Sequence, residues 1–123
     1  GCSSLENVTI PNGVTSIETY AFQNCTNLKE VVIPGTVTSI GANIFAGLSS
    51  LERVVISNGV TAIGFSAFKN CTGLKEITIP STVTSIGSYA FSGCDSLRSI
   101  QIPEALMEVG YDAFPADTKV ILY

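Results

Sequence analysis

Four cysteines carry the most reactive side chains of this chain of 123 residues. Cysteine thiolates bind zinc and form disulfides. The sequence contains no histidine, which excludes a Ser-His-Asp triad, a Cys-His pair and any histidine-ligated metal site. The chemistry open to the cysteines therefore depends on how the fold spaces them. They are Cys2, Cys25, Cys71 and Cys94.

The cysteines belong to a unit of 23 residues that recurs along the chain. The units follow one another from residue 1 to residue 114 without an insertion or a deletion. A period of this length lies within the range of about 20–29 residues that leucine-rich repeats show. Three repeat positions hold the same apolar residue in every unit, and the residues at one repeat position are called a column. The three columns are Phe22, Phe45, Phe68, Phe91 and Phe114; Ile10, Ile33, Ile56, Ile79 and Ile102; and Leu5, Leu28, Leu51, Leu74 and Leu97.

The fourth unit indicates which elements the repeat contains. Residues 74–79 have the pattern L-x-x-I-x-I, which predicts a strand with its isoleucines on one face. Pro80 follows and has no N–H to donate, so it suits the end of a strand. Residues 83–86 are mostly β-branched and predict a second short extended segment. Residues 88–91 fit a single helical turn on the outer side.

These elements predict a leucine-rich-repeat solenoid of the α/β repeat class, mostly β, with a parallel sheet on its concave face. Residues 1–123 form a single domain. Because the chain starts within a unit and no polar cap precedes it, we expect a longer array, or end-to-end self-association through the uncapped N-terminal repeat. The five repeats are about 1–22, 23–45, 46–68, 69–91 and 92–114, followed by a strand-like tail at 115–123.

The repeat resembles the BspA-like leucine-rich repeats of bacterial and protozoan surface proteins. The departures are few, such as Leu48 in place of the cysteine and Ser57 in place of the proline. The resemblance implies display at the cell surface, adhesion to host or matrix proteins, no catalysis and no cofactor. The motif I-P-x-x-V-T-x-I-G-x-x-A-F-x-x-C-x-x-L stands here as Ile79-Pro80, Val83-Thr84, Ile86-Gly87, Ala90-Phe91, Cys94 and Leu97.

The repeat also sets the distances between the cysteines, and these distances limit which bonds the cysteines can form. They occupy one position of successive layers, and layers are about 4.8 Å apart, so Cys2 and Cys94 lie roughly 19 Å apart and cannot share a zinc ion. Disulfides between Cys2 and Cys25 and between Cys71 and Cys94 fit the Cα separation that a disulfide needs. Because Leu48 fills the same position in the third unit, the position is a core position, which favours free buried thiols.

Two outward-facing columns of the predicted sheet are candidates for a binding surface. In the first column charges of opposite sign alternate, which suits either a ladder that fixes the strand register or a polar binding surface. The second column is partly apolar, and solenoids commonly bind their ligands at such a surface. The candidate protein-binding residues are Glu30, Val32, Arg53, Val55, Glu76, Thr78 and Gln101.

A second group of candidates lies just before the Ala-Phe pair of the repeat. These aromatic residues are either anchors for a ligand or side chains that pack over the turns of neighbouring layers. They are Tyr20, Phe65, Tyr89 and Tyr111.

Composition narrows the class of function. The net charge of −4 argues against nucleic acid and against an acidic membrane surface as partners. No apolar run reaches the roughly 18–20 residues that a membrane-spanning helix needs. We find no phosphate-binding glycine loop and no paired carboxylates in a cleft, and therefore expect no enzyme and no cofactor or metal.

The sequence therefore predicts a non-catalytic protein–protein interaction module of a cell-surface or secreted protein, which adheres to host or matrix proteins. Two alternatives stay open. One is a structural spacer that has no ligand of its own, and the other is a carbohydrate-binding module that uses the outer aromatic residues.

Overall fold

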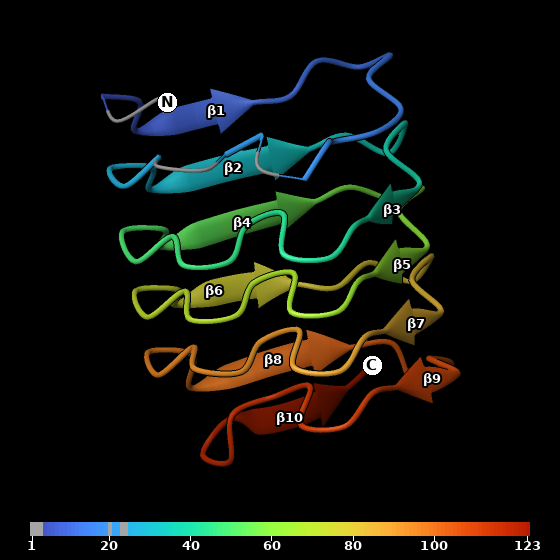
Figure 1. Ribbon diagram of the computed structural model, residues 1–123. Helices are drawn as coiled ribbons and strands as arrows, with labels where there is room; N and C mark the ends of the chain where they lie inside the picture. The colour runs from blue at the N-terminus through green and yellow to red at the C-terminus, as the bar shows by residue number, and fades with distance from the viewer. Residues whose placement is uncertain (1–3, 20, 23–24) are drawn as a thin grey trace.

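Two parallel sheets run along the computed structural model, which describes residues 4–19, 21–22 and 25–123. The larger sheet has six strands in the order β1-β2-β4-β6-β8-β10, and the smaller has four in the order β3-β5-β7-β9. Figure 1 shows the six strands stacked in one column and the four short strands in a second column beside it. The larger sheet comprises β1 Asn7–Thr9, β2 Glu30–Ile33, β4 Arg53–Ile56, β6 Glu76–Thr78, β8 Ser99–Ile102 and β10 Lys119–Leu122. The smaller sheet comprises β3 Ser39–Ile40, β5 Ala62–Ile63, β7 Ser85–Ile86 and β9 Glu108–Val109.

The repeat length sets the strand register up to β8. Val31 pairs with Val54, and Ile40 pairs with Ile63, each at the interval of the repeat. The last pairing differs, because Lys119 of β10 lies opposite Ser99 of β8, only 20 residues earlier. The connection before β10 is therefore three residues shorter than its equivalents, and β10 adds a sixth strand to the larger sheet.

The segment after the smaller sheet contains no helix in the part of the chain that the structure describes, so the predicted helical turn at 88–91 is wrong. The N–H groups of Tyr89 and Phe91 donate to the carbonyls of Tyr111 and Ala113 in the next layer, at 3.0 and 2.7 Å. The N–H of Phe68 donates to Ala90 in the same way, at 2.8 Å. These bonds to the next layer take alternate donors of the segment, while the Ala90 N–H makes only a turn bond to the Gly87 carbonyl at 3.3 Å. The bonds between layers form a third ladder along the solenoid.

A left-handed residue opens this segment and prevents a helix from starting there. The φ angle of Tyr89 is +60°. L-residues pay roughly 1–2 kcal/mol to adopt the left-handed conformation, and Asn and Asp tolerate it best. The same repeat position is left-handed in three other layers, at Asn43, Ser66 and Asp112.

The core consists of columns of side chains that stack from layer to layer. The rings of Phe45 and Phe68 lie 5.2 Å apart, and those of Phe68 and Phe91 lie 5.3 Å apart, with nearly parallel planes. All three rings are fully buried. Phe22 and Phe114 extend the stack to the first and last repeats, where they are only partly buried. The core is therefore continuous along the solenoid and open toward its two ends.

The turn after each strand of the larger sheet alternates between two forms. Gly59 has a φ of +114°, whereas the next layer has Thr82 at this position. The Thr82 hydroxyl accepts a hydrogen bond from the Gly59 N–H at 3.1 Å and donates one to the Val60 carbonyl at 2.8 Å. Thr36 makes the same two contacts with the first layer, to the Gly13 N–H and the Val14 carbonyl. A threonine in every second repeat therefore ties a glycine turn to the next layer.

The glycines after β5, β7 and β9 lie close to the backbone of the preceding layer. A Cβ atom on Gly87 would lie 2.6 Å from the backbone nitrogen of Phe65 in the preceding layer. A Cβ on Gly41, in the same column, would meet only side-chain atoms of Ile44, at an ordinary 3.6 Å. The close approach follows from the hydrogen bond between the Gly87 N–H and the Ile63 carbonyl, which is 2.7 Å long.

We expect Gly87→Ala to lower the free energy of unfolding by roughly 1–3 kcal/mol, because the backbone of the preceding layer must move. Gly41→Ala is the matched control, and it should change stability by less than about 0.5 kcal/mol. Urea unfolding followed by circular dichroism measures both. Equal stabilities of the two variants would show that the layers do not approach each other as described.

Candidate functional site

The exposed face of the larger sheet gathers the seven residues that the sequence predicted as protein-binding. Alternate residues of β2, β4 and β8 point into the core, among them Val31, Val54 and Ile100. The residues between them face outward, so neighbouring strands place equivalent side chains next to each other. The outward residues of the sheet face are Glu30, Val32, Arg53, Val55, Glu76, Thr78 and Gln101.

One outward column begins at Thr9 of β1 and contains two adjacent valines in β2 and β4. Val32 and Val55 pair directly and are half-buried. Thr78 and Gln101 follow and are exposed, and Ile121 of β10 continues the column beside Gln101. The repeat period alone does not predict Ile121 as a member of this column. The alternation in residues 119–122 could have found it, but only if the three-residue shortening before β10 had been recognised.

The other outward columns form ion pairs between layers. The Arg53 guanidinium lies 3.2 Å from the Glu30 carboxylate, and the Lys29 ammonium lies 3.3 Å from the Glu6 carboxylate. The side chains are largely exposed, so each pair contributes about 0.2–1 kcal/mol at most. Glu76 is exposed and takes part in neither pair. Opposite charges on neighbouring strands therefore support the register only weakly, and Glu76 lies outside both pairs.

A shallow hollow lies between β4 and β6 on this face. Arg53 and Val55 line one side, and Glu76 and Thr78 line the other. The hollow thus combines an apolar side chain with one side chain of each charge. At this hollow a partner would contact an apolar, a positively charged and a negatively charged side chain together.

The outer aromatic residues also come together in space. The Tyr89 ring meets the Phe65 ring and the Tyr111 ring edge to face, each at 5.8 Å between centroids. Phe65 is 51% exposed and Tyr111 is 71% exposed. The ammonium of Lys69, which the sequence analysis did not single out, lies 5.6 Å from the centre of the Tyr89 ring. Tyr20, the fourth predicted contact, lies outside the described residues.

The cysteines differ from one another. Cys71 and Cys94 are free and buried, as predicted. Cys25 is disulfide-bonded, so the prediction of a free thiol is wrong there, and the prediction for Cys2 lies outside the described residues. A core position of the repeat can therefore hold a bonded cysteine as well as a free one. Among the described residues, no group of three or more His, Cys, Asp or Glu could hold a metal ion.

Each free thiol donates a hydrogen bond to a backbone carbonyl of the preceding layer. The Cys71 thiol donates to the Phe45 carbonyl at 3.1 Å, and the Cys94 thiol donates to the Phe68 carbonyl at 3.1 Å. The hydrogen bond with Cys94 and burial raise the pKa of the Cys71 thiol well above its usual range. Cys71 therefore stays protonated and is a poor nucleophile.

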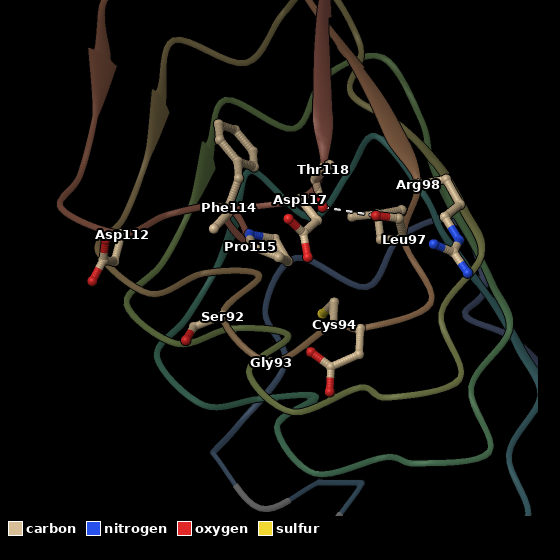
Figure 2. Close-up of a pocket in the computed structure, with 12 residues that line it drawn as sticks. Ser92, Gly93, Cys94, Leu97, Arg98, Asp112, Phe114, Pro115, Asp117 and Thr118 are labelled. Carbon is tan, nitrogen blue, oxygen red and sulfur yellow. Dashed lines mark hydrogen bonds between the residues drawn. The ribbon is translucent and has the colours of Figure 1, made fainter.

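A further hollow lies at the C-terminal end of the solenoid (Figure 2). The short connection before β10 runs above Cys94 and Leu97, and the Thr118 hydroxyl donates to the Leu97 carbonyl at 2.7 Å. Phe114 and Pro115 form its apolar wall. The rim carries charged side chains of both signs, namely Asp95, Arg98, Asp112 and Asp117.

No helix in the described part of the chain is long and apolar enough to cross a membrane.

Comparison with known proteins identifies a family and several solved structures that are similar to this chain. The BspA-type leucine-rich repeat region, in 6 copies, matches residues 1–120. The crystal structure of a leucine-rich repeat protein from Bacteroides ovatus has a TM-score of 0.85 and 30% sequence identity, and the match covers 100% of this chain and 37% of that one. These findings confirm the predicted leucine-rich-repeat solenoid with its parallel sheet. The search of curated proteins gave no match.

Two further solved structures have the same fold. A leucine-rich cell surface protein from Faecalibacterium prausnitzii has a TM-score of 0.75 and 36% identity, over 85% of this chain and 31% of that one. The leucine-rich repeat protein of Treponema pallidum has a TM-score of 0.78 and 28% identity, over 98% of this chain and 62% of that one. This chain therefore spans less than two thirds of the length of each of the three structures.

We expect iodoacetamide to label Cys71 and Cys94 only after the protein is unfolded, because both side chains are 0% exposed. Cys25 should be labelled only after unfolding and reduction. Peptide mapping by mass spectrometry measures all three sites. A Met107→Cys variant is the positive control, since Met107 is 79% exposed and its replacement should react in the folded protein. Rapid labelling of Cys94 in the folded state would contradict the closed core.

Proposed function

Because the chain belongs to the BspA-type leucine-rich repeat family, we propose that it is a non-catalytic module that binds a protein through the exposed face of the larger sheet. The observation that carries the proposal is the pair Val32 and Val55, which lies on the open face of a parallel sheet beside the ion pair of Glu30 and Arg53. Parallel sheets are normally covered on both faces. An open parallel face that displays valines is therefore a surface that a partner can cover.

The chemistry of the face favours a protein as the partner. Its column of alternating charges presents no basic stripe for a nucleic acid. Its apolar column suits the buried centre of an interface, and Arg53 and Glu76 suit a polar rim. The backbone of the strands is fixed by the ladders on both sides, so little ordering entropy is lost when a partner binds.

We place the module at the cell surface or in a secreted protein, where it adheres to a host or matrix protein. The relative from Faecalibacterium prausnitzii is described as a cell surface protein, which supports this location. The disulfide at Cys25 also supports it, because disulfides persist in oxidising surroundings outside the cell.

A second contact, between copies of the chain, is supported at the C-terminal end. Val120 and Leu122 of β10 occupy columns that are buried in the other layers, yet they are 41% and 60% exposed. The strands β1 and β10 are the two edges of the larger sheet, and an open edge can pair with another strand. We propose that β10 of one copy meets the N-terminal repeat of another. In a longer array the next repeat would cover the same side chains.

The protein ligand is tested with a Val32→Lys/Val55→Lys variant and immobilised fibronectin and fibrinogen at physiological salt. We expect saturable binding by the unchanged protein and at least about tenfold weaker binding by the variant, a loss of about 1.4 kcal/mol or more. Thr38→Lys/Thr61→Lys is the matched control, because it adds the same charge at exposed positions beside the smaller sheet.

Three outcomes of this experiment would contradict the proposal. Equal binding by both double variants and the unchanged protein would remove the sheet face as the site. Equal loss in both double variants would point to a general effect of charge. Absence of binding at high concentration would favour a structural spacer.

Association between copies is tested by sedimentation velocity over a range of protein concentrations. We expect the sedimentation coefficient to rise with concentration for the unchanged chain and to stay constant for Val120→Lys/Leu122→Lys, because two charges then prevent burial of the edge. A chain that stays monomeric at the highest concentration would contradict the contact.

A further inference from the structure

We propose that the aromatic strip, defined as Phe65, Tyr89 and Tyr111, binds a neutral oligosaccharide. This site would be separate from the face of the larger sheet. It lies at the start of the segment that returns from the smaller sheet, where Phe65 follows β5 and Tyr111 follows β9. The proposal does not depend on the protein ligand of the larger sheet.

The strip offers ring surface to solvent that the core does not use. Phe65 is 51% exposed and Tyr111 is 71% exposed, whereas the Phe68 and Phe91 rings of the neighbouring column are fully buried. The edge-to-face contacts, with interplanar angles of 84° and 83°, cover only part of each ring. Phe65 and Tyr111 therefore keep ring surface exposed to solvent while both contact the Tyr89 ring.

The backbone conformation of Tyr89 is a second, independent observation. Three other layers have Asn43, Ser66 and Asp112 at this left-handed position, and these small or polar residues suit it better than a tyrosine does. The fold thus holds a bulky ring in a conformation that disfavours it. Strained positions of this kind cluster at ligand sites. In this conformation the Tyr89 ring contacts both exposed rings.

The spacing of the strip suits an extended ligand. Phe65 and Tyr111 occupy one repeat position two layers apart, which corresponds to roughly 9.6 Å at the usual strand spacing. A linear oligosaccharide can run across the layers and place successive rings over successive aromatic side chains. A pyranose ring has an apolar face of C–H groups, which stacks on an aromatic ring, and a rim of hydroxyls, which needs hydrogen bonds.

Polar groups for such hydroxyls flank the strip. The Lys69 ammonium lies 5.6 Å from the centre of the Tyr89 ring and can donate. Asp112 is exposed directly after Tyr111 and can accept. The two side chains have opposite charge, which favours a neutral sugar over an acidic or a basic one.

A shallow trough on the smaller sheet adjoins the strip. Its lining includes the small residues Gly64, Gly87, Ser88 and Gly110, and the larger residues Met107, Glu108 and Val109. Gly64 and Gly110 directly precede Phe65 and Tyr111, so the trough and the strip form one continuous surface. The small side chains leave room for a flat ring, and Met107, which is 79% exposed, stands at the side of the trough.

The proposal is tested with a panel of neutral oligosaccharides built from β-linked glucose, from mannose and from N-acetylglucosamine. The chain has four tyrosines and no tryptophan, so its intrinsic fluorescence reports directly on tyrosine. We expect saturable fluorescence changes with at least one member at millimolar concentration, and calorimetry should give the same affinity. Tyr111→Ala should weaken binding about tenfold or more, whereas Tyr111→Phe should retain most of it because the ring is kept.

Controls separate a loss of the site from a loss of the fold. Lys119→Ala shortens an exposed side chain that is not aromatic on β10 of the larger sheet, outside the strip and the trough, and should bind sugar within about twofold of the unchanged protein. The urea unfolding midpoint of Tyr111→Ala should stay close to that of Tyr111→Phe.

Three results would overturn the proposal. The first is no binding by any member of the panel, and the second is binding that Tyr111→Ala leaves unchanged. The third is loss of fibronectin or fibrinogen binding in Tyr111→Ala without any sugar binding, which would make the strip a protein contact. The Val32→Lys/Val55→Lys variant should bind sugar normally, so that failure of either site is recognised separately.

Discussion

Hydrogen bonding between the backbones of successive layers is the constraint on which the rest of the structure depends. On the larger sheet the Glu52 N–H donates to the Lys29 carbonyl, and on the smaller sheet the Thr61 N–H donates to the Thr38 carbonyl. In the third ladder the Phe68 N–H donates to the Ala90 carbonyl. Buried backbone groups need partners, so every layer must place its donors and acceptors in the same register. The constant repeat length and the close approach at the glycine column follow from this requirement.

The same constraint separates two surfaces that could bind ligands. The ladders fix the backbone, so a side chain at a given repeat position stands directly beside its equivalent in the next layer. The result is a mixed apolar and charged face on the larger sheet and a strip of exposed rings beside the smaller one. A surface of either kind can be lengthened by adding repeats, and its chemistry can be changed one layer at a time.

Features that recur in every repeat could be predicted well from the sequence. The strand pattern and the phenylalanine column appear in each unit, so register and core could be read directly from the spacing. Departures from the period were harder to predict. The helical turn at 88–91 was wrong because the competing hydrogen bonds come from another layer and because a left-handed tyrosine gives no signal in sequence. The disulfide at Cys25 was the less favoured alternative because a cysteine in a core column has the same pattern whether it is free or bonded. Ile121 was missed because a short connection shifts β10.

The most direct test of the three ladders is a nuclear magnetic resonance measurement of scalar couplings across hydrogen bonds. These couplings identify the carbonyl that accepts from each amide. The structure predicts a coupling between the Phe68 nitrogen and the Ala90 carbonyl carbon, and another between the Phe91 nitrogen and the Ala113 carbonyl carbon. Couplings from these amides to Gly64 and Gly87 in their own repeats would instead indicate helical turns, and would contradict a solenoid held together by bonds between layers on all three sides.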